Sequence, residues 1–129
     1  LELEESPSGS QYIASFGSLY KILAWSPDVK GFSLGHVKKR YLVENLYKKN
    51  SISVQYDPDV MYLNSKKLEL NVEDTTWMHE PKYPFMISGY SSGFRLKGKI
   101  YSIRLYNRAL TQDEINHNYM VDKVRFGIK

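Results

Sequence analysis

One polar and aromatic stretch, "VEDTTWMHEPKYPF" at residues 72–85, gathers side chains that could recognise a sugar. An aromatic ring stacks on the apolar C–H face of a pyranose, and nearby polar groups then fix the orientation of the sugar. Long connections in compact domains are usually functional or poorly ordered. We therefore predict a glycan site in which the stacking rings and their hydrogen-bonding neighbours are Trp77, Tyr83, His79, Glu80 and Asp74. The alternative is that Trp77 only covers one end of the fold.

Two further loops carry candidate ligands. The stretch "SGYSSG", residues 88–93, offers Tyr90 as a second aromatic contact for a glycan. The stretch "YDPDV" places Asp57 and Asp59 where their carboxylates could bind calcium, which prefers several oxygen ligands from loops. Asp-Pro-Asp is also a good turn sequence, so the calcium hypothesis competes with a turn. Calcium is the one cofactor that we expect here, if any.

Composition excludes several classes of protein. The 129 residues are 42% hydrophobic and 25% charged, as in one globular domain. There is no cysteine, which excludes disulfides and thiolate metal sites, and no apolar run is long enough for a membrane span. The net charge is only +4, and the cluster Lys38-Lys39-Arg40 fits a solvated turn or a strand edge better than a nucleic-acid site. The chain starts at Leu1 and shows no signal peptide, so we interpret it as a processed product or a piece of a longer protein.

The rest of the chain alternates short strand-like runs with turn residues. Residues 1–10 are acidic and then rich in Ser, Pro and Gly, which indicates a linker or a frayed start before one domain at residues 11–129. The runs are rich in β-branched and aromatic residues and predict an antiparallel sandwich or barrel. They are "QYIASF", "YKILAW", "GFSLGHV", "RYLVENLY", "SISVQY", "VMYLN", "KLELNV", "FMISGY", "GFRLKG" and "KIYSIRLY".

The last of these runs leads into a helix start. Alternation along "KIYSIRLY" predicts a strand with Tyr101, Ile103 and Leu105 on the core face. Thr111 and Glu114 have the spacing of a capping box, which predicts a helix that begins there. This stretch is therefore expected to be scaffold, with no side chain left for chemistry.

The same stretch resembles a known family. "LKGKIYSIRLYNRALTQDEINHNY" is similar to the closing segment of the concanavalin A-like lectin/glucanase superfamily, in its laminin-G-like branch. "SISVQYDPDVMYLNSKKLEL" resembles a hairpin of that family, with Ser65 where glycine is usual. The resemblance covers residues 51–126, and the family's opening strands, which pair with the closing strand, are not visible in this sequence.

The resemblance implies an all-β fold, namely an antiparallel two-sheet jelly-roll sandwich with a short C-terminal helix. It also implies an extracellular, cell-surface or virion setting, as in secreted bacterial proteins and phage tail or fibre proteins. Hydrolases of the superfamily carry Glu-x-Asp-x-Glu along one strand. Here Glu69 and Glu73 flank Asn71, and Glu2 and Glu4 lie in the weakly patterned start, so we expect no enzyme.

Two functions remain open at this point. The first is a non-catalytic, lectin-like carbohydrate-binding module that takes part in adhesion. The alternative is a structural or protein–protein interaction module of a larger extracellular or virion protein, and a glycoside hydrolase fragment is a distant third. Exposed aromatic residues in a groove would favour the first, and an open strand edge or a broad apolar patch would favour the second.

Overall fold

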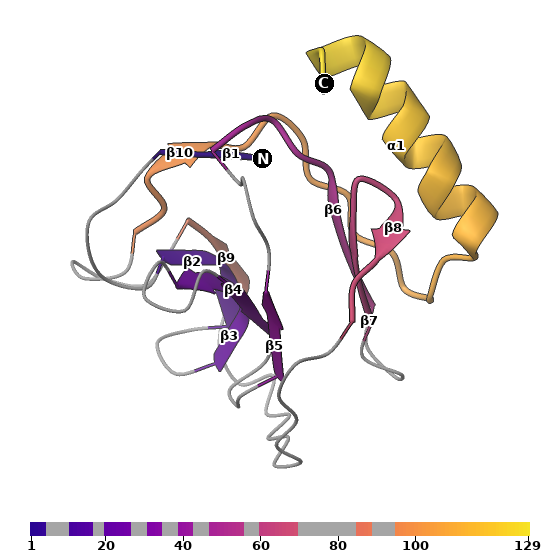
Figure 1. The fold of residues 1–129 in the computed structure, drawn as a ribbon. Coiled ribbons are helices and arrows are strands. Elements are labelled where there is room, and N and C mark those ends of the chain that lie inside the picture. Colours follow the sequence, from indigo (N-terminus) through magenta and orange to yellow (C-terminus); the bar gives the residue numbers. More distant parts are fainter. Residues whose placement is uncertain are drawn as a thin grey trace. The chain divides into compact units, whose positions relative to one another are not determined.

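The computed structural model describes residues 1–4, 11–16, 20–26, 31–34, 39–42, 47–55, 60–69, 85–88 and 95–129. These parts consist mostly of strands in antiparallel sheets, followed by one C-terminal helix (Figure 1). The chain divides into two compact units. The first consists of Leu1–Glu4, Asn45–Glu69 and Gly98–Lys129, and the second of Glu5–Glu44 and Leu70–Lys97. The all-β character that the sequence predicts is thus present.

The second unit contains a five-stranded antiparallel sheet in the order β5-β4-β3-β2-β9. Ile13 and Leu23 are its buried apolar residues among those described. The side chain of Gln11 is also buried, and its Oε1 accepts a hydrogen bond from the Lys97 amide at 2.7 Å. The strands are β2 (Gln11–Phe16), β3 (Tyr20–Ser26), β4 (Gly31–Leu34), β5 (Lys39–Leu42) and β9 (Phe85–Ile87).

The first unit contains two small sheets and the helix. Strands β6 (Ile52–Gln55), β7 (Val60–Leu63) and β8 (Lys66–Lys67) form an antiparallel sheet in that order. Strands β1 (Glu2–Leu3) and β10 (Gly98–Lys99) form an antiparallel pair. The described buried apolar residues of this unit are Leu3, Met61, Ile115 and Ile128.

The turn between β7 and β8 places Ser65 in a backbone conformation that favours glycine, the residue that the related hairpins usually have at this position. Asn64 and Ser65 both have positive φ, 49° and 66°, and Leu63 pairs with Lys66. Two such residues in a row are typical of the two-residue hairpin turn whose twist matches that of the strands, and glycine is favoured at the second position. Asn64 also donates from Nδ2 to Asn50 Oδ1 and accepts from the Ser51 amide, both at 2.9 Å. Ser65 therefore carries backbone strain that a glycine would not.

Helix α1 (Gln112–Phe126) begins as the sequence predicts. The Thr111 side chain accepts from the Glu114 amide, and the Glu114 carboxylate accepts from the Thr111 amide, so both halves of the capping box are present. The helix ends at Gly127, which has a left-handed φ of 64°. At 15 residues α1 is longer than the short helix that the sequence predicts.

The strand prediction for "KIYSIRLY" is wrong for most of its length. Only Gly98–Lys99 belongs to a strand, and residues 100–106 belong to no ladder. The predicted core face is exposed: Tyr101 is 37% exposed, Ile103 42% and Leu105 72%. A strand needs a neighbouring strand for its backbone groups, and the described parts of the chain supply none here. Similarly, "GFRLKG" forms no strand at residues 95–97, and in the described part of "KLELNV" only Lys67 belongs to a strand.

Candidate interaction surface

The glycan and calcium candidates all lie outside the described residues. This holds for the predicted sugar contacts and for the predicted calcium ligands, which are Trp77, Tyr83, His79, Glu80, Asp74, Tyr90, Asp57 and Asp59. The described chain ends at Glu69 before the first loop and resumes with β9 at Phe85. These sites therefore stay predictions.

Within the described residues, acidic and histidine side chains do not gather. No group of three or more that could hold a metal ion is present among them. Glu2, one of the acidic residues considered above, accepts a hydrogen bond from the Tyr101 hydroxyl at 2.5 Å. Across the same residues, no helix has the length and apolar character needed to cross a membrane.

The most specific arrangement in the first unit joins residues 101–108 to helix α1. Arg104 makes a bidentate ion pair with Asp122, with nitrogen–oxygen distances of 2.8 and 2.7 Å. Arg108 makes a second bidentate pair with Glu114, at 2.8 and 2.6 Å. A bidentate ion pair fixes the relative orientation of its two side chains in addition to pairing their charges, because the planar guanidinium matches the carboxylate. The two ion pairs thus fix the segment to the helix at two places.

Aromatic side chains add contacts between and beyond the ion pairs. Asn118 Nδ2 donates to the Tyr106 hydroxyl at 3.2 Å. At the other end of the helix, the rings of Tyr101 and Phe126 lie 5.6 Å apart. Rising residue numbers in the segment therefore meet falling residue numbers in α1, which means that the two run antiparallel.

The spacing of these contacts has a simple geometric cause. Arg104, Tyr106 and Arg108 are two residues apart, and their partners on α1 are four residues apart. Two residues of extended chain span about 6.6 Å. Four residues of α-helix span about 6 Å, so every second residue of the segment meets the next turn of the helix. We name this set of contacts, Arg104–Asp122, Tyr106–Asn118 and Arg108–Glu114, the helix ladder.

The ion pairs of the helix ladder change the acidity of their carboxyl groups. Hydrogen bonds from Arg104 lower the pKa of Asp122, which is only 8% exposed. Hydrogen bonds from Arg108, and then from the Thr111 amide, lower the pKa of Glu114 from 4.5 to about 2. Both carboxylates are therefore charged at neutral pH and keep their arginine partners neutralised.

Helix α1 is also held at both ends, by the residue Lys49 that precedes β6 and by the turn between β7 and β8. Lys49 Nζ donates to the Phe126 carbonyl at 3.0 Å, and Gln112 Nε2 donates to the Ser65 carbonyl at 3.0 Å. The segment itself ends near β6, because Gln55 Nε2 donates to the Leu110 carbonyl at 2.7 Å. In Figure 1 the segment runs in orange from β10 toward the start of α1. It is thus positioned by the helix and the sheet, although it belongs to no sheet.

The other side of the segment carries apolar residues. Arg104 and Tyr106 contact α1, whereas Ile103 and Leu105, which alternate with them, make no contact of the helix ladder. Ile103 and Leu105 are 42% and 72% exposed, respectively. Within the part of the chain that the structure describes, no backbone hydrogen bond reaches residues 100–108. We call residues 100–106 the open segment.

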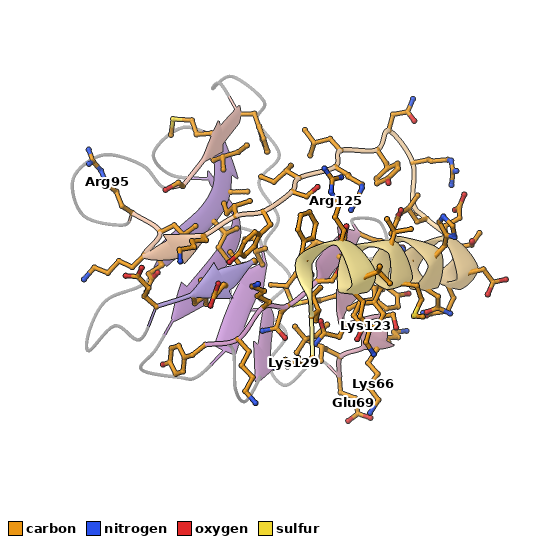
Figure 2. All side chains as sticks on the ribbon, turned by 90° about the horizontal axis from the view of Figure 1, so that it is seen from above. Lys66, Glu69, Arg95, Lys123, Arg125 and Lys129 are labelled. Atoms are coloured by element: carbon orange, nitrogen blue, oxygen red, sulfur yellow. The ribbon has the colours of Figure 1, made fainter. Side chains whose placement is uncertain are left out.

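The last turn of α1 carries two basic side chains, Lys123 and Arg125. Lys123 and Arg125 point to opposite sides of the helix (Figure 2). Lys123 Nζ lies 5.9 Å from the centre of the Tyr119 ring, and Arg125 Cζ lies 5.2 Å from the centre of the Phe126 ring. These cations are spread around the helix and do not form a single anion-binding cluster.

The sequence interpretation missed the open segment as a functional candidate. It assigned Tyr101, Ile103 and Leu105 to the core and left nothing in this stretch for function. One signal could have found the surface: a closing strand with a strong apolar alternation but no visible strand to pair with. The structure adds that Tyr101, Arg104 and Tyr106 contact α1.

Comparison of the chain with protein-family models, with curated proteins and with solved structures finds no match.

Proposed function

We propose that this chain is a non-catalytic interaction module of a larger extracellular or virion protein, and that it binds polypeptide in extended form at the open segment. The observation that supports this proposal is the exposure of Ile103 and Leu105 on a backbone without ladder hydrogen bonds. The resemblance to laminin-G-like domains supports a jelly-roll framework, the setting and the absence of catalysis. An added strand gains main-chain hydrogen bonds, and its alternate side chains meet the exposed apolar residues.

The helix ladder favours this function energetically. A disordered acceptor must lose conformational entropy when it binds, which weakens binding. The open segment is already fixed by the bidentate Arg104–Asp122 ion pair and by Tyr101, and the residues that follow it are fixed by the Arg108–Glu114 pair and by Gln55. The loss of conformational entropy on binding therefore falls mainly on the added strand.

The test is a selection of random 12-residue peptides on the immobilised chain. We expect the selected peptides to carry apolar residues at alternate positions and to lose at least tenfold in affinity on Ile103→Asp and on Leu105→Asp. The control is Val124→Asp, because Val124 is 83% exposed but lies on the helix. Peptides that bind the Ile103→Asp and Val124→Asp variants equally well would contradict the proposal, as would no enrichment from a folded sample.

A second candidate function rests on the sequence of residues 72–85. Trp77 and Tyr83, with the polar neighbours named above, have the composition of a glycan site, and Tyr90 adds a third ring. We propose this lectin-like function beside the first because the two surfaces involve different residues. A glycan and polysaccharide panel, with and without calcium, tests it on the wild-type chain and on Trp77→Ala. A specific glycan signal that Trp77→Ala abolishes would support the lectin, and a signal unchanged in Trp77→Ala would place the site elsewhere, with Tyr90→Ala next.

If the glycan signal depends on calcium, Asp57→Asn and Asp59→Asn should remove the dependence. A signal that is equal with and without calcium would leave the proposed calcium site without a role in glycan binding. Silence on the whole panel from a well-folded sample would contradict the lectin proposal and leave the interaction module.

A further inference from the structure

We infer that the partner strand enters between the open segment and β6, where it continues the line of β1 and forms main-chain hydrogen bonds on both of its sides. This inference rests on the proposed interaction function and specifies where the partner binds. The partner is an extended, uncharged stretch of another polypeptide.

Strand β1 shows that the fold accepts a strand in this line. On one side, Glu2 pairs with Lys99 of β10. On the other side, the Leu1 nitrogen donates to the Asn50 carbonyl at 2.8 Å, and the Asn50 amide donates to the Leu1 carbonyl at 2.7 Å. Two residues that exchange both hydrogen bonds form an antiparallel pair. Strand β1 therefore lies between β10 and the residue that leads into β6.

The two neighbours of β1 continue past it in the same direction. Both are antiparallel to β1, so their residue numbers rise as those of β1 fall. The open segment follows β10, and β6 follows Asn50. The two therefore flank the place into which the Leu1 end of β1 points.

Strand β6 has free backbone groups on this side. The Ser51 carbonyl accepts from the Asn64 amide at 2.8 Å, so the backbone groups of Ser51 and of every second residue after it point to β7. Those of Ile52 and Val54 point the other way, to the side on which β1 lies. In the part of the chain that the structure describes, no backbone hydrogen bond reaches Ile52 or Val54 from that side. Both residues are half-buried, so pairing would satisfy backbone groups that water reaches poorly.

The open segment offers the facing edge. Both backbone groups of Leu1 point to Asn50, so those of Glu2 point the opposite way, to Lys99. The chain after Lys99 stays beside this line, because the Tyr101 hydroxyl still reaches the Glu2 carboxylate. A strand between these two edges forms main-chain hydrogen bonds on both sides, whereas a strand added to an outer edge forms them on one side.

The far end of this place is closed by a side chain. Gln55 of β6 donates from Nε2 to the carbonyl of Leu110, which follows the open segment, at 2.7 Å. The four residues of β6, Ile52 to Gln55, span about 13 Å of extended chain. The place between Leu1 and this hydrogen bond therefore has room for a partner stretch of about four residues.

The flanking side chains determine the chemistry of the partner. Strand β6 carries no charged residue, and Arg104, the one charged residue of the open segment, is already paired with Asp122. A charged side chain of the partner would lose water here without gaining an opposite charge, which is costly. β-branched and aromatic residues favour an extended chain and can contact the exposed Ile103 and Leu105. The partner stretch is therefore uncharged and rich in such residues.

Amide hydrogen exchange tests the position of the partner, with a 12-residue peptide from the selection described above as the probe. We expect the amides of Ile52 and Val54 to exchange rapidly in the free chain and at least tenfold more slowly in the complex. The amides of Ser53 and Gln55 are internal controls, because they point to β7 and are protected in both states. Unchanged exchange at Ile52 and Val54, together with slower exchange in the open segment, would overturn entry beside β6.

Two proline variants test the same edge by peptide affinity. Ile52→Pro removes an N–H that points to the partner and no hydrogen bond of the β6–β7 ladder, and proline is tolerated at the first residue of a strand. It should lower the affinity at least tenfold. Lys67→Pro is the matched control at the opposite edge of the sheet, because the Leu68 amide donates to Met61 and the Lys67 amide therefore points outward. A folded Ile52→Pro variant, checked by thermal melting, that binds as tightly as Lys67→Pro would overturn the inference.

Substitutions in the peptide test the chemistry of the partner. Asp or Lys in the middle of the bound stretch should lower the affinity at least tenfold. Thr at the same position should have a smaller effect, because it is uncharged and favours an extended chain. Equal affinity of the Asp, Lys and Thr peptides would contradict the requirement for an uncharged partner.

The inference and the proposed function fail separately. A peptide that is lost on Ile103→Asp but leaves Ile52 and Val54 unprotected keeps the interaction module and places the partner on another edge of the open segment. A folded chain that enriches no peptide overturns both.

Discussion

Helix α1 and the open segment are neighbours in the chain, yet one matches its sequence prediction and the other does not. The start of α1 depends on Thr111 and Glu114, which are three residues apart, so all the necessary partners are local. The open segment has an equally regular pattern, but a strand needs a second strand that can come from far away or from another chain. A capping box is therefore sufficient evidence for a helix start, whereas alternation is insufficient evidence for a buried strand.

The two regions also differ in what holds them. The helix keeps its internal hydrogen bonds and its caps, and it buries Ile115 almost completely. The open segment is held through side chains, by Arg104 and Tyr106 of the helix ladder and by Tyr101, which donates to Glu2. Substitutions in only one of the two regions can therefore distinguish stabilisation by backbone hydrogen bonds and caps from stabilisation by side-chain contacts.

The largest effect is expected at Gly98, the first residue of β10, the strand that precedes the open segment. Gly98 has a φ of 149°, and an added Cβ would fall onto the Glu2 carbonyl oxygen and within 2.9 Å of Leu3 Cα. Gly98→Ala should lower the free energy of unfolding by about 3 kcal/mol, measured by urea denaturation. Gly127→Ala is the matched control, because Gly127 has a φ of 64° but no atom within 4 Å of an added Cβ. It should cost only about 1 kcal/mol, and equal losses in the two variants would show that the β1–β10 contact is not what requires glycine.

The next effect is expected at the Arg104–Asp122 ion pair of the helix ladder. Arg104→Met leaves the Asp122 carboxylate without its partner while that residue stays only 8% exposed. We expect a loss of about 2 kcal/mol in the free energy of unfolding. The double variant Arg104→Met with Asp122→Leu should recover part of this loss, because no buried charge then remains.

Hydrogen exchange adds a readout of the segment itself. In Arg104→Met the amides of α1 should keep most of their protection if the helix is supported by its own caps and by Ile115. A helix that loses protection together with the segment would show that the two regions form one cooperative element, contrary to the comparison above.

A smaller, stabilising effect is expected in the locally encoded hairpin. Ser65→Gly relieves the strain of a φ of 66° and should raise stability by about 1 kcal/mol, or the melting temperature by roughly 4 °C. Asn64→Gly is the control, because Asn64 also has positive φ but its side chain makes two hydrogen bonds that glycine would lose. A lowered melting temperature in Ser65→Gly would mean that the Ser65 hydroxyl has a role of its own.

The smallest effect is expected in the pH dependence of stability, through Glu114 at the start of α1. The pKa of Glu114 is lowered from 4.5 to about 2 in the folded chain, so folding favours the charged carboxylate. Its contribution to stability is therefore fully present above about pH 4.5 and is lost as the pH falls toward 2. Stability measured by denaturation from pH 6 to pH 2 should fall less steeply in Arg108→Gln than in the wild-type chain. Lys123→Gln should retain the wild-type slope, because Lys123 lies over the Tyr119 ring and shifts the pKa of neither Glu114 nor Asp122.

Much of the secondary structure could be predicted because its causes are local. The runs "QYIASF", "YKILAW", "SISVQY" and "VMYLN" form β2, β3, β6 and β7, since β-branched and aromatic side chains favour the extended chain. The strain at Ser65 followed from the residue type that such a turn prefers. The residues predicted to bind glycan or calcium lie outside the described parts of the chain, so sequence remains the only basis for those sites.

The sequence alone determined where α1 begins, where the turn at Asn64 and Ser65 lies and which runs favour strands, because each depends on residues a few positions apart. Only the tertiary structure decided that Arg104 belongs to Asp122, that Gly98 must make room for the Glu2 backbone and that Ile103 and Leu105 remain exposed. These outcomes depend on partners 18 and more positions away in the chain, or on their absence from the described residues. Local patterns specify an element, but the burial of its faces depends on which other elements are present to cover them.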